Sequence, residues 1–325
     1  MTKKICAYED NEGFVCNEHA NESGLCFWHD PSQDKSGPKV KEKLEQYVRS
    51  GEQTRGIILK HADLRQVNLV NHHKKQGFDF SYADLYRAKL ECAHLFNIRL
   101  DHASLMKANL TAANINCASL RDCNLLGVRW HECKIENIKL GKELRQQRLA
   151  KVANQKKAFD DAADLYEQAE EIYRDLRKHS EREGLFSLSG DLIQKELTVR
   201  RMRMPKFSFK RLGSKIVDVF CGYGEAPLRI VFISIIMIII CASIYTFTGL
   251  NYQGNIIAYG SDKPILENIS LFLSCLYYSV VTFTTLGYGD FTPIGHSRAV
   301  AAIEAFTGSF TIALFVVVFV KKMTR

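Results

Sequence analysis

Apolar residues recur at every fifth position between Ile57 and Leu140. A small residue, usually Ala or Cys, lies two positions before most of them, and Asn or Asp often lies between. Neither an α-helix nor a plain strand has a period of five, whereas a square coil with four five-residue sides does. The apolar and small residues then face inward, and each coil stacks on the next through backbone hydrogen bonds, at a spacing of about 4.8 Å. We expect about four such coils between Ile57 and Leu140. The in-phase series is Leu85, Leu90, Leu95, Leu100, Leu105, Leu110, Ile115, Leu120, Leu125, Trp130, Ile135 and Leu140.

The repeated unit is Ala-Asp-Leu at 83–85 and Ala-Asn-Leu at 108–110. It resembles the unit of the pentapeptide-repeat family, Ala-Asp/Asn-Leu-x-x. The resemblance implies a right-handed quadrilateral β-solenoid over residues 57–140. The first repeats lie one position out of phase with the others, and an insertion at about 71–77 separates the two series.

The charge of the repeat region bears on its role. Twelve Lys and Arg oppose eight Asp and Glu between Ile57 and Leu140, a net charge of +4. Some pentapeptide-repeat proteins imitate DNA with an acidic surface, and this balance argues against that role. We favour a rigid spacer, or a docking surface for a cytosolic protein or ligand. The two ends of the solenoid must be capped, or paired with a solenoid of another subunit.

Two apolar stretches near the C-terminus are long enough to cross a membrane. Residues 230–247 carry no charge, and residues 299–320 carry only Glu304. At 1.5 Å per residue the second stretch spans about 33 Å, which exceeds the hydrocarbon core. Pro227 can begin the first helix at the interface. The apolar run from 269 to 281 is shorter and predicts a re-entrant helix that does not span.

Between these stretches lies the run TTLGYGD at 284–290, preceded by an amphipathic segment at 267–283. Consecutive carbonyls aimed at one axis require a backbone that alternates between regions, and glycine tolerates the left-handed one. The run resembles the selectivity filter of potassium channels, with Leu286 where Val is usual. The resemblance implies that four such loops replace the hydration shell of K⁺. It places Asp290 at the outer mouth, and it implies ion-binding oxygens on Thr285, Leu286, Gly287, Tyr288 and Gly289.

Two further residues of the last stretch are singled out. Gly308 matches the hinge glycine of potassium-channel inner helices, and close packing against a neighbouring helix is the alternative interpretation. Glu304 is the only acid in its span. An acid at membrane depth is functional or tied to a partner, and a structural bond to the pore helix is the role we expect.

Basic residues set the expected orientation. Eight Lys and Arg lie between Arg200 and Arg229, Lys206 among them, and the chain ends in a basic segment that includes Arg325. The connection from 248 to 266 carries a single basic residue, Lys263. We therefore expect a multi-pass protein of the inner or plasma membrane with both termini in the cytoplasm. The start of the chain shows no signal peptide.

The first thirty residues predict a metal site. Thiolates and one imidazole in a C-x9-C-x9-C-x2-H pattern can form a closed tetrahedral zinc site, which a short segment with little apolar content needs in order to fold. His19 is a rival for the fourth position. Ten cysteines in a cytoplasmic context argue for thiols or metal rather than disulfides. The predicted ligands are Cys6, Cys16, Cys26 and His29.

A helix-forming composition between the repeats and the membrane predicts a connector of two or three helices, the last from 191 to 204 after breaks at Gly184 and Gly190. A basic amphipathic helix follows and should lie along the inner leaflet. The expected organisation is a metal-binding segment at 1–31, linker and short helix at 32–56, solenoid at 57–140, connector at 141–205, interfacial helix at 206–226, and pore at 227–325.

The sequence therefore favours a multidomain membrane protein. Its function would be passive K⁺ conduction by a homotetramer, with K⁺ in the filter, Zn²⁺ at the N-terminus and a repeat domain for assembly or gating. A membrane-anchored interaction scaffold is the alternative. Nucleic-acid binding is disfavoured, because the basic excess clusters beside the first span. Nothing positive supports an enzyme, since no catalytic grouping or phosphate loop is present.

Overall fold

A computed structural model describes residues 4–205, 207–262 and 264–324. Lys206, Lys263 and Arg325, which entered the orientation argument, lie outside these ranges. The chain divides into two compact units, Met1–Ser208 and Phe209–Arg325, and each is described by itself.

The repeat region forms stacked coils of 20 residues. Parallel bridges join one residue of each pentapeptide to the residue 20 positions later, from Asp79↔Arg99 to Ser119↔Lys139. The three earliest bridges, beginning with Ile58↔Asp84, join residues 26 positions apart, because the insertion lies between their partners. A residue with positive φ recurs at five-residue intervals, as at Ala112 (φ 56°) and Cys117 (φ 64°). Four pentapeptides per coil thus follow from turns at each fifth residue.

The interior of the coils holds the predicted residues. Leu105 and Ala108 are almost completely buried, and so are the other apolar residues of the in-phase series and the small residues two positions before them. Cys123 and Cys133 occupy small-residue positions of the core. Burial raises the pKa of the Cys133 thiol to about 12, so it stays protonated at neutral pH. The interpretation of these cysteines as small fillers is confirmed.

Leu105→Ala should destabilise the solenoid by about 2–5 kcal/mol, because it leaves a cavity in a core that cannot collapse between two coils. Native-state hydrogen exchange at the amides of neighbouring coils measures this loss. Phe96→Ala is the control, since Phe96 is 43% exposed on the same solenoid. Equal protection in both variants would contradict the packing argument.

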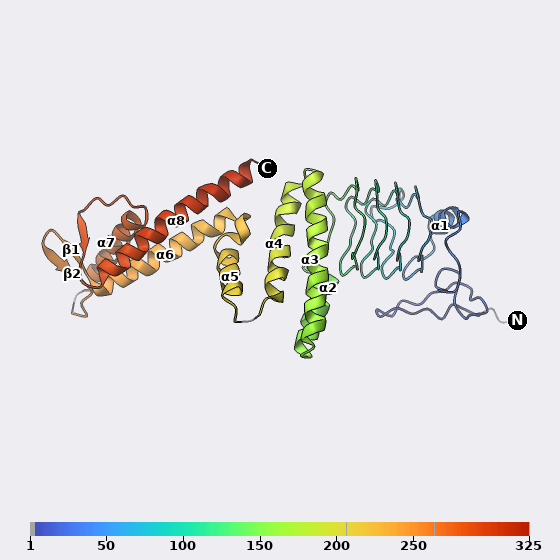
Figure 1. Cartoon of the computed structure of the whole chain (residues 1–325), viewed down its shortest axis with the longest axis horizontal. Coiled ribbons are helices and arrows are strands. Elements are labelled where there is room, and N and C mark those ends of the chain that lie inside the picture. The colour runs from blue at the N-terminus through green and yellow to red at the C-terminus, as the bar shows by residue number, and fades with distance from the viewer. Residues whose placement is uncertain (1–3, 206, 263, 325) are drawn as a thin grey trace. The chain divides into compact units, whose positions relative to one another are not determined.

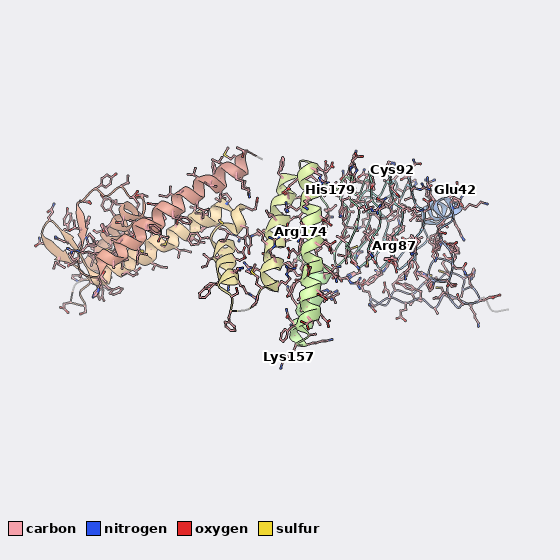
Figure 2. The ribbon with its side chains drawn as sticks, in the orientation of Figure 1. Glu42, Arg87, Cys92, Lys157, Arg174 and His179 are labelled. Carbon is pink, nitrogen blue, oxygen red and sulfur yellow. The ribbon has the colours of Figure 1, made fainter. Side chains whose placement is uncertain are left out.

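Helices cap both ends of the solenoid (Figure 1). Helix α1 (Lys39–Arg49) buries Val40, Leu44 and Val48 in the solenoid core. At the other end lie α2 (Arg145–Gln155), α3 (Phe159–Arg182) and α4 (Phe186–Arg203). His179 of α3 points toward the last coil (Figure 2) and its Nε2 lies 2.7 Å from the Cys133 carbonyl oxygen. The ends are therefore closed within one chain, and pairing of solenoids is not needed to cover them.

Helix α4 begins earlier than the sequence indicated. It starts at Phe186 rather than Asp191, and Gly190 lies inside it rather than breaking it. Ser189 and Gly190 are buried, and the Ser189 hydroxyl donates to Glu181 of α3 at 3.1 Å. Close packing against α3 stabilises the turn that glycine weakens, so tertiary contact overrides local propensity.

The second unit is built on three long apolar helices. Helix α5 (Phe209–Cys221) and a short 3₁₀ turn (Gly222–Gly224) lead into α6 (Pro227–Thr248), and α7 (Ile265–Phe283) and α8 (Ser297–Met323) follow. Three short strands, β1 (Leu250–Tyr252), β2 (Asn255–Ile257) and β3 (Phe291–Pro293), form an antiparallel sheet in the order β2-β1-β3.

Helices α6, α7 and α8 are each long and apolar enough to cross a membrane. The predicted spans correspond to α6 and α8, and Pro227 begins α6 as expected. Helix α7 is longer than the apolar run at 269–281, because it begins four residues earlier, with the polar Glu267 and Asn268 in its first turn, and ends two residues later. Length alone therefore does not exclude that α7 spans, and its re-entrant character stays a prediction.

Candidate functional site

The TTLGYGD run begins where α7 ends. Val281 accepts a hydrogen bond from the Leu286 N–H, and Thr282 accepts one from the Thr285 N–H, both at 3.0 Å. This pair of bonds around a left-handed residue is the Schellman motif that closes many helices, usually with glycine. Here the left-handed residue is Thr285, with φ 57°. A β-branched residue in that region is strained, and such strain is typical of functional backbone.

The backbone of the run alternates as its sequence predicted. Positive φ occurs at Thr285, Gly287 (58°) and Gly289 (80°), whereas Leu286 and Tyr288 keep negative φ. Such alternation lets successive carbonyls face the same side of the chain. In the single chain the side chains of Leu286 and Tyr288 are 58% and 66% exposed. The loop therefore presents a surface that its own chain does not cover.

The segment that joins α6 to α8 begins and ends at the same end of these two helices. The Tyr259 N–H donates to the Thr246 carbonyl near the end of α6, and Asn268 at the start of α7 donates to the Gly260 carbonyl. After the run, β3 pairs with β1, which directly follows α6, in the register Tyr252↔Phe291. Figure 1 shows α7 beside the strands at one end of α6 and α8.

The far end of α7 reaches the middle of α8. An added Cβ at Gly308 would lie 2.1 Å from the carbonyl oxygen of Phe283, the last residue of α7. Gly308 lies eleven residues after the start of α8 at Ser297. The absence of a side chain at this position therefore allows the end of α7 to touch α8 directly.

Gly308→Ala should destabilise the second unit by about 1–3 kcal/mol, because the methyl group must displace the end of α7. If this unit conducts ions as the sequence predicts, the substitution should also reduce ion flux. Thermal unfolding and liposome flux of the purified variant measure both effects. Gly213→Ala is the matched control, because Gly213 is in exposed α5 with nothing within 4 Å of an added Cβ. A changed open probability with unaltered stability would favour a hinge over close packing.

Glu304 joins three helices behind this loop. It is 1% exposed and accepts a hydrogen bond from the Tyr245 hydroxyl of α6 at 2.6 Å. It also accepts one from the Ser279 hydroxyl of α7. Ser279 lies 2.9 Å from the Ile238 carbonyl as well. The structural bond that we expected between Glu304 and the helix before the TTLGYGD run is confirmed, and this helix is α7.

The N-terminal segment gathers the predicted metal ligands. The ligand atoms of Cys6, Cys16, Cys26 and His29 all lie within 4.8 Å of one another and are buried. A tetrahedral Zn²⁺ with Zn–S near 2.3 Å sets its ligand atoms about 3.5–3.8 Å apart. Cys16 Sγ lies 3.9 Å from Cys26 Sγ, and Cys6 Sγ lies 3.7 Å from His29 Nδ1. The arrangement is compatible with zinc, and the rival His19 lies outside the cluster.

The surroundings prepare His29 as a ligand. Its Nε2 lies 2.8 Å from the Arg55 carbonyl oxygen, which can only accept, so the proton is on Nε2 and Nδ1 faces the thiols. Burial lowers the pKa of His29, which keeps the imidazole neutral. Burial also raises the pKa of the Cys16 thiol to about 12. Binding of a metal here would therefore release protons, and the affinity would weaken as the pH falls.

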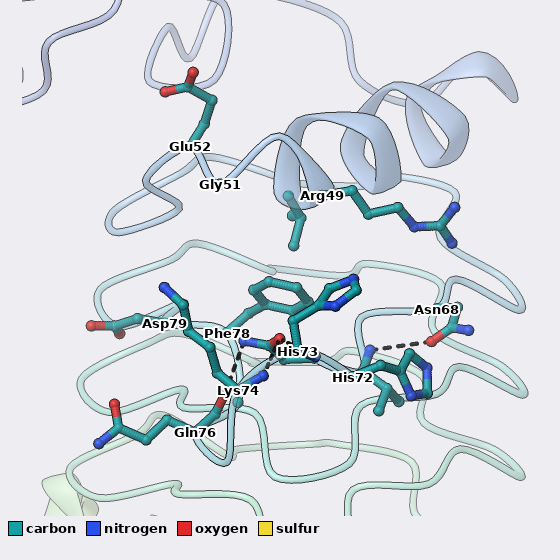
Figure 3. A pocket seen from close by; sticks show the side chains of 14 residues that line it. Arg49, Gly51, Glu52, Asn68, His72, His73, Lys74, Gln76, Phe78 and Asp79 are labelled. Carbon is teal, nitrogen blue, oxygen red and sulfur yellow. Dashed lines mark hydrogen bonds between the residues drawn. The ribbon is translucent and has the colours of Figure 1, made fainter.

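The insertion at 71–77 shapes a hollow of about 480 Å³ between α1 and the coils (Figure 3). The Asn71 side chain accepts hydrogen bonds from the N–H groups of His73 and Lys74. Gly77 is required here, because an added Cβ would lie 1.9 Å from the Asn97 carbonyl oxygen. The sequence showed the insertion as a break in the period but gave no sign of this hollow.

Comparison with known proteins agrees with this division. Residues 232–325 match the family model described as "Ion channel", and residues 88–127 match eight copies of pentapeptide repeats. No match is found among curated proteins. The chain therefore combines an ion-channel region with a pentapeptide-repeat region, two families that are typically not enzymatic.

Solved structures similar to the chain are pentapeptide-repeat proteins. QnrB1, a plasmid-mediated fluoroquinolone resistance protein, in a trypsin-treated form is 17% identical over 28% of this chain and 45% of its own, with a TM-score of 0.23. A pentapeptide-repeat protein from Nostoc PCC 7120 is 24% identical over 31% of this chain and 95% of its own, with a TM-score of 0.26. HetL from the same strain, involved in heterocyst differentiation regulation, is 26% identical over 27% of this chain and 49% of its own, with a TM-score of 0.18. The match spans under half of QnrB1 and HetL.

Proposed function

We propose that the chain is one subunit of a homotetrameric potassium channel that conducts passively. The observation that carries the proposal is the alternating backbone from Thr285 to Gly289, which lies inside the region that matches ion channels. Carbonyl oxygens of this loop, together with the Thr285 hydroxyl, would replace the hydration shell of K⁺. One chain supplies one loop, and a closed ring needs four, so fourfold symmetry follows.

In this proposal α7 is a re-entrant pore helix. The contacts of Tyr259 with Thr246 and of β3 with β1 support it, because the chain enters and leaves at the same end of α6. The contact of Phe283 with Gly308 would then mark the depth at which the chain turns back. Asp290, which accepts from the Phe291 N–H at 3.0 Å, would lie at the outer mouth.

The remaining parts fit the same arrangement. With the loop toward the outside, both termini would be cytoplasmic. The apolar side chains of α5 that remain exposed, Phe209 (91%) and Leu212 (56%), support its placement along the inner leaflet. Lys321 at the end of α8 pairs with Glu225, just before α6, at 2.8 Å. This ion pair would couple the amphipathic helix to the cytoplasmic end of the pore.

The cytoplasmic unit would serve assembly or gating. We propose that its coils form a right-handed quadrilateral solenoid and that the cluster of three cysteines and His29 holds Zn²⁺ as a structural ion. A membrane-anchored scaffold is the second candidate. The observation favouring it is that the capped solenoid presents several hollows outside the pore unit.

Ion flux into liposomes under a potassium gradient tests the proposal. Purified protein should run as a tetramer and pass K⁺ in preference to Na⁺. A tetramer that passes neither ion under any applied voltage would favour the scaffold. A monomeric or dimeric particle would contradict the channel proposal.

A further inference from the structure

A hollow of about 610 Å³ lies where three parts of the first unit meet. One wall is a column of the solenoid corner, because Tyr82, His102 and Asp122 are 20 residues apart and therefore stack on successive coils. The rings of Tyr82 and His102 lie parallel, with centroids 4.8 Å apart. Asn11 of the N-terminal segment, residues 141–143 after the last coil, and Arg145 and Arg148 of α2 also line it.

The acids at this hollow are already neutralised. Asp122 accepts two hydrogen bonds from Arg148, at 2.9 and 2.6 Å, and lies 3.0 Å from His102 Nδ1. Glu143 forms an ion pair with Lys151. Both acids are therefore paired with cations of α2: Asp122 ties the helix to the coils, and Glu143 ties it to the segment just before it.

Three cations at the same hollow are not neutralised. Arg121, Lys142 and Arg145 line it, and among the described residues none of them pairs with a carboxylate. The stem of Arg121 lies over Gly141, where an added Cβ would be 3.6 Å from its Cγ. Like charges gathered on one concave surface repel one another and raise its affinity for an anion.

We propose that this hollow binds a small anion carrying two or more phosphate groups, a nucleotide or a free polyphosphate. Three cations that line one hollow carry more positive charge than a ligand with a single carboxylate would balance. The planar guanidinium groups of the two arginines suit phosphate oxygens. The volume is that of a small-molecule site. Arg121 also lines an adjoining hollow of about 650 Å³ with Lys75 and Lys139. Arg99 lines it too but pairs with Asp79 and Asp101, which are part of the same lining. The two lysines would allow a longer ligand to extend along this face.

Such a ligand would join the solenoid corner to α2. Arg121 belongs to the repeats and Lys142 directly follows them, whereas Arg145 begins α2. Binding would therefore stabilise the first unit by an amount that grows with the logarithm of ligand concentration above the dissociation constant. This inference concerns the first unit alone and stands whether or not the pore conducts.

Calorimetric titration of the full-length protein with ATP, tripolyphosphate and adenosine tests the proposal, with the melting temperature as a second readout. We expect ATP, tripolyphosphate or both to bind and raise the melting temperature, and adenosine not to bind. Binding of ATP alone identifies a nucleotide, and equal binding of both identifies a polyphosphate site. Absence of binding by either anion at low salt would overturn the proposal.

Variants distinguish this site from general attraction to a basic surface. Arg121→Ala and Arg145→Ala should each weaken binding roughly tenfold or more, because each removes a charge-assisted contact. Arg129→Ala is the matched control: it removes the same charge from an exposed residue of the same coils, outside the hollow. Circular dichroism confirms that the variants fold. Equal weakening by all three would sink the assignment, because it would show only diffuse electrostatics.

Discussion

Gly287→Ala should abolish the preference of the pore for K⁺ over Na⁺. Gly287 has φ 58°, a region that costs a residue with a Cβ about 1–2 kcal/mol. Nothing lies within 4 Å of an added Cβ in the single chain, so the cost is in the backbone rather than in a clash. In the proposed tetramer four copies of this strain would meet in one ring, and relaxing it would rotate a carbonyl away from the ion.

The measurement is the reversal potential, or competing K⁺ and Na⁺ flux, in liposomes that hold purified tetramers. Gly295→Ala is the matched control. It has φ 49° and open space around an added Cβ, but it lies after β3 and outside the loop. It should carry a similar backbone cost with selectivity intact. If Gly287→Ala tetramers still favour K⁺, the carbonyls of this loop do not select the ion.

Tyr288→Ala should have the same outcome for a different reason. The Tyr288 ring is 66% exposed in one chain, and we expect neighbouring subunits to cover it in the tetramer. Without the ring, the loop loses the lateral support that fixes the width of the carbonyl ring. The selectivity assay above measures this effect. A phenylalanine at this position should retain most of the selectivity if packing is what matters.

Cys16→Ser should abolish binding of the proposed Zn²⁺ and unfold the N-terminal segment. A structural Zn²⁺ in such a site contributes about 10–16 kcal/mol of binding free energy at neutral pH, which is folding free energy for the segment. Metal content per chain, measured by mass spectrometry, should fall from one to near zero. Chymotrypsin should then cut at Trp28, which is 3% exposed in the folded segment.

Cys92→Ser is the control for this experiment, because Cys92 is exposed on the solenoid and lies outside the cluster. Chelation of the unaltered protein should reproduce the Cys16→Ser result, and acidification should favour metal loss because protons compete for the thiolates. Unchanged protease resistance after complete metal loss would show that the segment folds without a metal. The contacts of His29 with Arg55 and of Trp28 with Ile58 would then suffice.

The period of five, the two apolar stretches and the TTLGYGD run were enough to predict the main elements. Each of these signals is local, because a repeat or motif determines the backbone conformation of its own segment. The predicted ligand set was also correct as a cluster, since Cys26 and His29 lie one turn apart and only two further thiols had to approach. The sequence left His19 as a rival because spacing alone cannot show which imidazole faces inward.

Long-range packing decided the rest. Gly308 meets Phe283 because α7 and α8 cross at that point, and Gly190 stays helical because α3 covers it. Arg121, Lys142 and Arg145 share one hollow because a 20-residue coil and a capping helix bring them together. A linear pattern records the conformation of a segment and the face it buries, whereas contacts between segments depend on their mutual placement, which only the folded structure fixes.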